Sequence, residues 1–412
     1  MKMNRQYALW FGLIIIGSML AACETAPTSK PPAVTSKPPA VVTIPHIMTI
    51  SPTTLYTPSK WQMLPDWSTL DLTPSWVAML QSCSALKTKP QWQAICAGAA
   101  LVDKNDSEAQ RKFYEDKFAL FQIFNPDGSE NGVMTGYYEP LLKGSRSKNE
   151  RYRFPLYGVP EDMLEIDLGD AYPQLKGHLL RGRLSGNRVV PYFKRAEIDG
   201  GTDEFKGREL FWVESKIELS FLQIQGSGRI ELEDGSQVKV GYANQNGYPY
   251  ISIGALLVEM NELKQKQASM QGIKAWGEKN PNKLIGLLEL NPSYVFFREL
   301  PEHLTAPLGA LGVPLTKEYS IAVDPKCIPM GSPVFVATTR PNTTVPLNRL
   351  MLAQDTGGAI KGPVRADFYW GFGEKAGAQA GHMKQQARMW VLFPKGGEPM
   401  VHDTEKKTRY SN

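Results

Sequence analysis

The sequence contains few of the residues with which enzymes bind a catalytic metal. It has five histidines and four cysteines, and no His-x-x-x-His or Cys-x-x-Cys pair brings two of them together. Zinc sites need three or four such ligands, usually at short and recognisable spacings. We therefore expect neither a metal nor a cofactor. The histidines are scattered over the chain, at His46, His178, His303, His382 and His402.

Three further features are missing. No Gly-x-Ser-x-Gly motif is present, which argues against the serine chemistry of the α/β-hydrolases. The apolar run from Tyr7 to Leu20 is shorter than the roughly 20 residues that a membrane-spanning helix needs. The net charge is +5 and falls by two if Lys2 and Arg5 are removed with a signal peptide, which is far from the strongly basic surface of a nucleic-acid-binding protein.

The N-terminus has the pattern of a secretory signal, predicted to cover residues 1–22. A basic head precedes the short apolar run, and Leu20-Ala21-Ala22-Cys23 resembles a bacterial lipobox. The resemblance implies that Cys23 is lipidated. Several acyl chains on this residue would anchor the protein stably to a membrane. Glu24 follows where an aspartate would favour the inner membrane, so we expect a lipid anchor at the periplasmic face of the outer membrane. The alternative is an ordinary cleaved signal with an incidental cysteine.

Residues 23–47 form a linker between the lipid and the folded body. The segment is rich in Pro, Thr, Ser and Lys, and Thr-Ser-Lys-Pro-Pro-Ala-Val occurs twice in tandem, at 28–34 and 35–41. Such a composition cannot bury a core and favours an extended, semi-rigid stalk. The remaining chain, about 365 residues, is long enough for two domains.

The body has a mainly β pattern with some helices, an α+β class. Apolar spacing predicts helices over 75–100, 107–123, 252–264, 267–278, 281–289 and 374–386, and strands over 132–140, 209–213, 217–224, 237–242, 293–297, 321–323, 333–336, 350–353 and 388–393. Gln225-Gly226-Ser227-Gly228 is predicted to be a tight turn, or alternatively a backbone surface that a ligand can approach closely. We expect residues 395–412 to be loose.

Cys83 and Cys96 are candidates for a short disulfide loop in an oxidising compartment, which would leave Cys327 free. The alternative is that all three are reduced apolar fillers.

Aspartates are the strongest candidates for chemistry. Asp355 and Asp367 lie twelve residues apart across a glycine-rich turn, each beside apolar neighbours, and Asp324 follows an apolar strand upstream. Burial raises a carboxyl pKa toward the range in which the group works as an acid. Aspartates beside glycines also commonly cap turns, and Asp324, next to Pro325, fits that role best.

Aromatic and amide residues near glycines suit the stacking of sugar rings and the binding of their hydroxyls. Tyr137, Tyr138 and Tyr242 are the main aromatic candidates, although each type is also common in cores. Together with the acidic pair and the envelope location, they point to a glycan.

Several motifs occur together along the chain in the order in which a known family has them, so the resemblance is specific. They are Thr135-Gly136-Tyr137-Tyr138-Glu139-Pro140, Arg195-Ala196-Glu197-Ile198, Gln225-Gly226-Ser227-Gly228, Gly241-Tyr242-Ala243-x-x-Asn246-Gly247, Ser252-Ile253-Gly254, Asn291-Pro292-Ser293-Tyr294-Val295-Phe296-Phe297 and the three aspartate segments. Over roughly 130–393 the chain resembles the membrane-bound lytic murein transglycosylase A family. The resemblance implies a double-psi β-barrel, the "3D" domain, from 48–141 plus 304–395, a second β-barrel-like domain inserted at 142–303, a glycan-binding groove between them, and a tail at 396–412.

The resemblance also implies the reaction and its residues. Asp367 matches the catalytic aspartate, Asp355 its supporting partner and Asp324 the third of the set. Asp367 would cleave the β-1,4 bond between MurNAc and GlcNAc in peptidoglycan without water, leaving 1,6-anhydro-MurNAc ends. The loop between Asp355 and Asp367 is one residue longer than the family pattern. The resemblance therefore does not fix the positions of Lys361 and Arg365, while Asp367 still matches. The residues expected to bind the glycan are Tyr137, Tyr138, Gln225, Gly226, Ser227, Tyr242, Asn246, Gly357, Gly358 and Lys361.

Two rival functions fit part of the pattern. A hydrolase with Asp367 as acid and Asp355 as base would act on the same glycan but release reducing ends. A non-catalytic glycan-binding lipoprotein, acting as a scaffold, would explain the aromatics but not the acidic set. Expected partners are peptidoglycan strands, the membrane through its lipid anchor, and cell-wall synthesis or division complexes, with no nucleic acid.

Overall fold

The structure is a computed structural model that describes residues 56–176, 178–201 and 203–399. The predicted signal peptide, Cys23 and the linker lie outside these residues. The helices are α1 Thr73–Leu86, α2 Pro90–Ala99, α3 Ser107–Lys117, α4 Arg195–Asp199, α5 Lys216–Gln225, α6 Ile253–Glu259, α7 Met270–Lys279, α8 Pro281–Glu289 and α9 Glu374–His382. The strands are β1 Tyr56–Pro58, β2 Phe118–Ile123, β3 Gly132–Glu139, β4 Leu141–Ser145, β5 Phe154–Tyr157, β6 Leu164–Asp167, β7 Leu179–Ser185, β8 Arg188–Pro191, β9 Glu209–Val213, β10 Ser227–Glu231, β11 Gln237–Gln245, β12 Val295–Glu299, β13 Ser320–Val323, β14 Pro333–Thr339, β15 Pro346–Asp355, β16 Arg365–Phe372 and β17 Lys384–Pro394.

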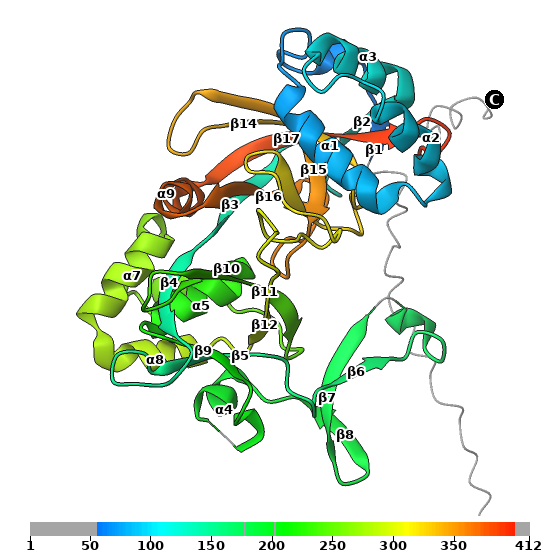
Figure 1. The fold of residues 1–412 in the computed structure, drawn as a ribbon. Helices are drawn as coiled ribbons and strands as arrows, with labels where there is room; N and C mark the ends of the chain where they lie inside the picture. The colour runs from blue at the N-terminus through cyan, green and yellow to red at the C-terminus, as the bar shows by residue number, and fades with distance from the viewer. Residues whose placement is uncertain (1–55, 177, 202, 400–412) are drawn as a thin grey trace, which may run out of the picture. The chain divides into compact units, whose positions relative to one another are not determined.

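Six strands form a ring of hydrogen-bonded pairs, in the order β17-β14-β15-β13-β16-β3, and β3 pairs back to β17. Figure 1 shows these strands together, with β1 and β2 extending the ring at one edge. The ring encloses a core that includes Ile321, Val334, Met351 and Phe368. Successive side chains of a strand point to opposite faces, so each ring strand also presents side chains on its outer face.

Helices α1 to α3 pack on the outside of this ring (Figure 1), with α1 against β15, α2 against β17 and α3 against β2. Their apolar residues, such as Trp76 and Tyr114, join Phe335 and Trp390 of the ring in a second core. Helix α3 begins where Asp106 accepts hydrogen bonds from the backbone N–H groups of residues 108 and 109, which is a standard N-cap. A disulfide joins Cys83 and Cys96, with Cα atoms 5.2 Å apart, and Cys327 is free and partly buried.

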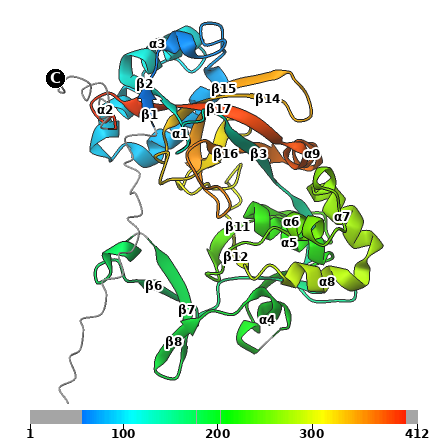
Figure 2. The same cartoon turned by 180° about the vertical axis from the view of Figure 1, so that it is seen from behind.

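A second sheet begins one residue after the ring strand β3 ends. Pro140 separates β3 from β4, and β4 lies in a six-stranded sheet ordered β12-β11-β10-β4-β9-β5. A bridge between Gly158 and Phe297 brings the two ends of this sheet together. The mainly β, α+β architecture with a second sheet inserted between ring strands is thus confirmed. In Figure 2, seen from behind, helix α9 of the ring lies beside β3, and α6 to α8 lie on the side of the inserted sheet.

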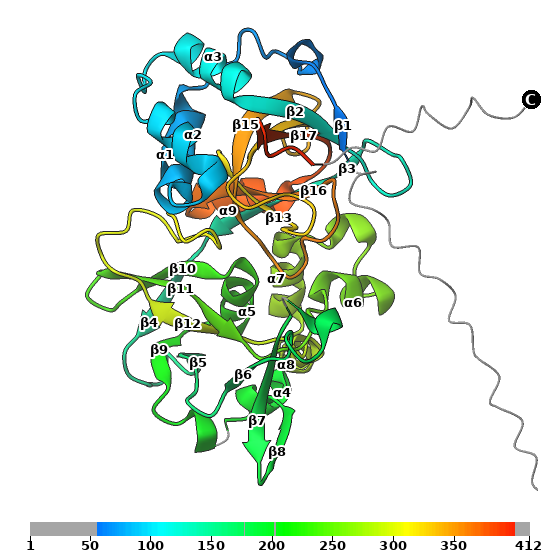
Figure 3. The same cartoon turned by 90° about the vertical axis from the view of Figure 1, so that its right-hand side faces the viewer.

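A three-stranded meander, β6-β7-β8, completes the inserted part. Figure 3 shows its β7–β8 hairpin projecting away from the six-stranded sheet. Within the described ranges, no helix combines the length and the apolar character that crossing a membrane requires.

The predicted strand over 217–224 is wrong, because this segment is helix α5. Leu219 and Leu222 pack into the core of the inserted sheet, while Phe221 packs against α6, α7 and α8. A helix buried on two sides has apolar residues all round, and a short apolar run of this kind cannot be told from a strand by periodicity. The caps were the informative signal: the Ser215 hydroxyl accepts from the N–H of Glu218, and Gly226 ends the helix at φ +79°.

Two predicted helices extend into segments that are strands. The helix predicted over 107–123 ends at Lys117, and Phe118–Ile123 is strand β2, which pairs with β17. The helix predicted over 374–386 ends at His382, because residues from Lys384 onward pair with β3 as part of β17. In both places ladder hydrogen bonds to a distant strand decide the conformation, and local spacing does not record them.

Candidate active site

Two strands carry Asp355 and Asp367 to either side of one alanine. Ala322 on β13 pairs with Asp355 on β15 and, on its other side, with Asp367 on β16. Asp367 in turn pairs with Thr135 on β3. Directly opposed residues share a face of a sheet, so the two carboxylates lie at one level on the outside of the ring, about 10 Å apart at the backbone. Ala322 is buried between them in a small cluster with Tyr137, Leu315, Ile360 and Tyr369.

Asp367 has one engaged and one free carboxyl oxygen. Its Oδ1 accepts a hydrogen bond of 2.7 Å from the Thr135 hydroxyl. No residue in the described part of the chain donates to its Oδ2. Burial raises the pKa of Asp367 above its usual value of 3.8, and the Thr135 hydrogen bond and the positive charge of Arg365 partly oppose that rise. A carboxyl group with a raised pKa and a free Oδ2 can donate a proton from that oxygen.

Asp355 has both oxygens engaged. Its Oδ1 accepts from the backbone N–H groups of Ala310 and Thr356, at 3.0 and 2.9 Å, and its Oδ2 accepts from the Tyr137 hydroxyl at 2.9 Å. Burial raises the pKa of Asp355 to about 6, against the effect of these three donors, and the nearby Asp367 raises it further. The two carboxyls are therefore unequal: Asp355 is a fixed acceptor, while Asp367 has an oxygen available for a reacting group.

Asp324 anchors the loop between the two aspartates. It is buried, its Oδ1 accepts from the N–H of Lys326, and its Oδ2 accepts from the N–H of Gly362 at 2.9 Å. Gly362 has φ +103°, a conformation that favours glycine. Gly357, Gly358 and Lys361 belong to the same loop, where the Lys361 ammonium lies 3.4 Å from the carbonyl oxygen of Gly357. This predicted group therefore lies on the loop that joins the two strands carrying Asp355 and Asp367, and Asp324 holds that loop through Gly362.

The two neighbouring tyrosines of β3 point to opposite faces. Tyr137 contacts Asp355 and lies beside Tyr369, with ring centroids 5.2 Å apart, on the same face as Asp367. Tyr138 points the other way, where it packs with the buried residues of the ring and α9, and its hydroxyl donates to the sulfur of Met270 on α7. Only Tyr137 of this pair therefore lies with the carboxylates.

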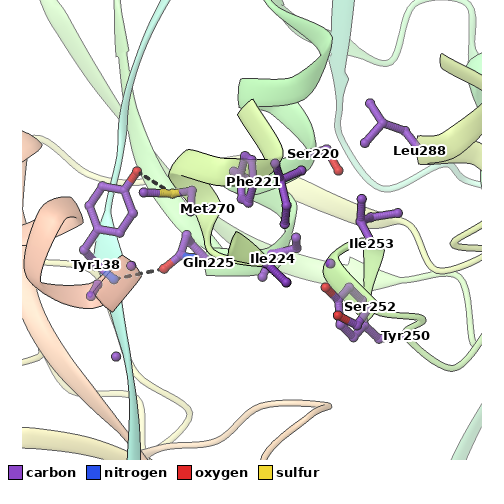
Figure 4. A pocket seen from close by; sticks show the side chains of 16 residues that line it. Tyr138, Ser220, Phe221, Ile224, Gln225, Tyr250, Ser252, Ile253, Met270 and Leu288 are labelled. Atoms are coloured by element: carbon purple, nitrogen blue, oxygen red, sulfur yellow. Dashed lines mark hydrogen bonds between the residues drawn. The ribbon is translucent and has the colours of Figure 1, made fainter. Parts of the chain in front are cut away.

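Gln225, Gly226 and Ser227 lie where α5 passes into β10. The Gln225 side chain accepts from the backbone N–H of Tyr138 at 2.9 Å, which ties α5 to ring strand β3. Figure 4 shows both residues at a cavity of about 170 Å³ that is also lined by Ile224, Tyr250 and Ser252. The left-handed conformation of Gly226 requires glycine, and Ser227 is buried at the start of β10. Gln225 thus lies with Gly136 and Tyr138 at this cavity, whose lining includes neither carboxylate.

Tyr242 and Asn246 belong to β11 and the turn after it. Tyr242 is exposed and free to contact a ligand. Asn246 is buried: its amide nitrogen donates to the carbonyls of Phe193 and Pro292, and its amide oxygen accepts from the N–H of Tyr294, each at 2.8 Å. Every polar atom of the Asn246 side chain is therefore bonded to backbone.

Sequence reasoning missed Thr135, Ala322 and the pair Glu139–Arg229. Thr135 stands at the start of the motif that contains Tyr137, but only the pairing of β3 with β16 places it at Asp367. Glu139 is fully buried and forms an ion pair of 3.1 Å with Arg229, whose guanidinium stacks on the ring of Phe372. This pair links the end of β3 to the inserted sheet.

The site defines an acid–base enzyme of the carboxylate type, in which a partly buried acid with one free oxygen lies beside a fully hydrogen-bonded second acid. Among the residues that the structure describes, no three His, Cys, Asp or Glu side chains are grouped closely enough to hold a metal ion.

Comparison with known proteins identifies the family. The MltA specific insert domain matches residues 133–298, and the 3D domain matches residues 319–393. Membrane-bound lytic murein transglycosylase A of Escherichia coli K12 is 33% identical over 296 residues, which cover 70% of this chain and 72% of that protein. The chain belongs to the membrane-bound lytic murein transglycosylase A (MltA) family.

Solved structures support the same assignment. MltA from Neisseria gonorrhoeae is 39% identical, with a TM-score of 0.73 over 84% of this chain and 94% of that one. E. coli MltA with bound chitohexaose is 27% identical, with a TM-score of 0.59 over 78% of this chain and 90% of that one. The ring of six strands is accordingly the double-psi β-barrel of this family, and the second sheet is its inserted domain.

Proposed function

We propose that this chain is a lytic murein transglycosylase that cleaves the β-1,4 bond between MurNAc and GlcNAc and forms 1,6-anhydro-MurNAc, with Asp367 as both acid and base. The membership of the chain in the MltA family supports the activity, and the chitohexaose bound to the E. coli relative supports a glycan substrate. One observation carries the assignment of Asp367: its Oδ2 has no hydrogen-bond donor among the described residues, whereas both oxygens of Asp355 are occupied.

The reaction needs a single carboxyl group that works twice. Protonated Asp367 gives its proton to the glycosidic oxygen, the C1–O4 bond breaks, and GlcNAc leaves with a free 4-hydroxyl. The C6 hydroxyl of the same MurNAc attacks C1 and passes its proton to the Asp367 carboxylate, which restores the starting acid. Because the nucleophile belongs to the substrate, closure benefits from a high effective concentration, and no water is consumed. General acid and base catalysis typically contribute about 10²–10⁴-fold each.

Asp355 supports this cycle without taking part in proton transfer. Its carboxyl group, held by Tyr137 and two backbone N–H groups, faces Asp367 across Ala322, and repulsion between the two carboxylates disfavours the state in which both are ionised. It also lies where it can stabilise positive charge that develops on the anomeric carbon. Tyr137, Tyr242 and the loop with Gly357, Gly358 and Lys361 are the residues we propose for holding the sugars near Asp367. At the junction of the two sheets, we propose that the glycan also contacts Gln225, Gly226, Ser227 and Tyr138.

The chain is a membrane-associated protein of the cell envelope, as the names of its relatives indicate. We further propose that a lipid on Cys23 anchors it at the periplasmic face of the outer membrane, and that 23–47 is the linker. The proposed domains are the barrel, 48–141 plus 304–395, and the insert, 142–303. Metabolic labelling with a radioactive fatty acid should mark the wild-type protein and not the variant Cys23→Ser.

Digestion of isolated peptidoglycan sacculi followed by mass analysis tests the reaction. The wild-type protein should release muropeptides one water lighter than hydrolysis products, and Asp367→Asn should release none above background. Asp234→Asn is the matched control, because Asp234 lies exposed in the β10–β11 turn and the charge change is the same. Hydrated products would instead establish a hydrolase, and binding of sacculi without release would establish a scaffold. Full activity of Asp367→Asn would refute the assigned acid.

A further inference from the structure

We propose that Thr135 is a positioning residue for Asp367, and that Arg365 fixes the Thr135 hydroxyl in the orientation that makes Oδ2 of Asp367 the oxygen that exchanges the proton. This inference rests on the proposed function, because it concerns the same acid. It is carried by a short chain of hydrogen bonds on the outer face of strands β3 and β16.

The Thr135 hydroxyl lies between a group that can only donate and a carboxyl oxygen. Its Oγ1 is 2.8 Å from Nη2 of Arg365 and 2.7 Å from Oδ1 of Asp367. A guanidinium has no acceptor, so Oγ1 accepts from Arg365 and the single hydroxyl hydrogen is left for Oδ1. A serine or threonine hydroxyl normally rotates to suit its surroundings, and here the arginine removes that freedom.

Arg365 is itself held by backbone. Its Nη1 donates to the carbonyl oxygens of Ala366 on its own strand and Val133 on β3. The guanidinium is therefore tied to both strands of the parallel pair that carries Thr135 opposite Asp367. The arrangement links three side chains on one face of the two strands, with Arg365 two residues before Asp367.

The consequence is a division of labour between the two oxygens of Asp367. Oδ1 accepts from Thr135 in either protonation state, so the proton of the acid form sits on Oδ2. A fixed proton on a fixed oxygen reduces the number of orientations the acid must search before it meets the glycosidic oxygen. A freely rotating carboxyl would spend part of its time with the proton turned toward β3.

The same contacts oppose the effect of burial on the pKa of Asp367. A hydrogen bond to the carboxylate and a nearby positive charge both favour the ionised form. The other groups that face Asp367 are Asp355 from β15, Tyr137 from β3 and the exposed Lys384, which pairs with Thr135 from β17, while β13 contributes only Ala322. Removing the Thr135 hydroxyl should therefore raise the pKa of Asp367.

The test compares Thr135→Val, which removes the hydroxyl and keeps the shape, with Thr135→Ser, which keeps the hydroxyl. On sacculi, Thr135→Val should lower kcat by roughly tenfold or more at an unchanged KM, since misplacing a reacting group by about 1 Å costs up to 10²-fold. The pH above which the rate falls should move upward, because the acid must be protonated to act and its pKa is higher. Thr135→Ser should keep the wild-type kcat and pH profile.

Two further variants make the outcome decisive. Thr338→Val is the matched control, because it removes a hydroxyl of β14 that donates to the backbone carbonyl of Gln386 on β17 and contacts neither carboxylate, and it should change neither kcat nor the pH profile. Arg365→Gln tests the chain of hydrogen bonds from its other end, so that the inference does not depend on valine being accommodated. It should lower kcat and move the pH profile upward in the same way.

Unchanged kcat and pH profile in Thr135→Val and Arg365→Gln would overturn the inference. If Asp367→Asn is inactive in the same assay, that result leaves the proposed function intact. An active Asp367→Asn would instead remove the proposed acid and with it this inference. A loss of activity with equal effects at every pH and a raised KM would show a merely structural role for Thr135 and would also overturn the proposal.

Discussion

Replacing Asp355 with asparagine should stabilise the folded protein at neutral pH. Asparagine has nearly the same shape, and its amide oxygen can accept from Ala310 and Thr356 as Oδ1 of Asp355 does now. Its amide nitrogen can donate to the Tyr137 oxygen in place of the present bond, in which Tyr137 donates. The substitution therefore removes a buried charge and keeps the hydrogen bonds.

The magnitude follows from the pKa of Asp355. Burial raises it from 3.8 to about 6 in the folded protein. Between these values the folded state holds a proton that the unfolded state has lost, so wild-type stability falls as the pH rises through this window. The loss is complete above pH 6 and amounts to roughly 3 kcal/mol at most. Asparagine does not ionise and avoids this loss.

Urea unfolding at pH 4, 5, 6 and 7 measures the effect. The two proteins should differ little at pH 4, and Asp355→Asn should become more stable by up to about 3 kcal/mol at pH 7. In Asp234→Asn the sign should be opposite, because hydrogen bonds from Ser236 lower the pKa of Asp234 and its ionised form is the favoured one. A difference between wild type and Asp355→Asn that is constant with pH, or a variant less stable at pH 7, would refute the assignment of a buried, ionised Asp355.

Two other substitutions test the geometry of the site. Ala322→Val places two methyl groups between the carboxylates and should lower kcat by roughly tenfold; by further desolvation it should raise the pH above which activity falls, whereas Ala337→Val on β14 should leave the pH profile unchanged. Asn246→Ala leaves the carbonyl of Phe193 and the N–H of Tyr294 without partners, while the carbonyl of Pro292 keeps the N–H of Arg195. It should cost about 2–4 kcal/mol in denaturant unfolding, and the KM for sacculi should stay constant. A raised KM without a loss of stability would return Asn246 to the substrate-binding residues.

Much of the architecture could be predicted, and the two wrongly predicted segments have different physical causes. Strands such as β3, β9 and β14 were recognised because each has an apolar face or a continuous apolar run bounded by turn residues. Segments 118–123 and 217–224 were assigned the wrong structure. In the first, pairing with β17 overrides the helical spacing, and in the second, burial on two sides removes the contrast on which periodicity depends.

The candidate site also contains residues that the sequence identifies and residues whose use only the structure shows. Asp355 and Asp367 could be selected because carboxylates between apolar residues and glycines are unusual, and the motif around Tyr137 drew attention to β3. Asn246 and Tyr138 belong to equally conspicuous motifs, yet one is used entirely by backbone and the other packs with buried residues of the ring and α9. Motif membership does not record which face of a strand a residue occupies or whether its polar atoms are already bonded.

The sequence by itself determined which residue types are available: three aspartates, a glycine-rich loop, aromatic strands and a mainly β chain without a His-x-x-x-His or Cys-x-x-Cys pair. Only the tertiary structure decided how they are used. Asp355 and Asp367 lie on strands that are not neighbours, and β13, which comes earlier in the chain, separates them by one small residue, Ala322. Their unequal roles depend on the donors that reach each oxygen, and those donors come from segments more than 200 residues away as well as from the next peptide. Hydrogen bonds of this kind are set by strand register, which the spacing of residues along the chain does not contain.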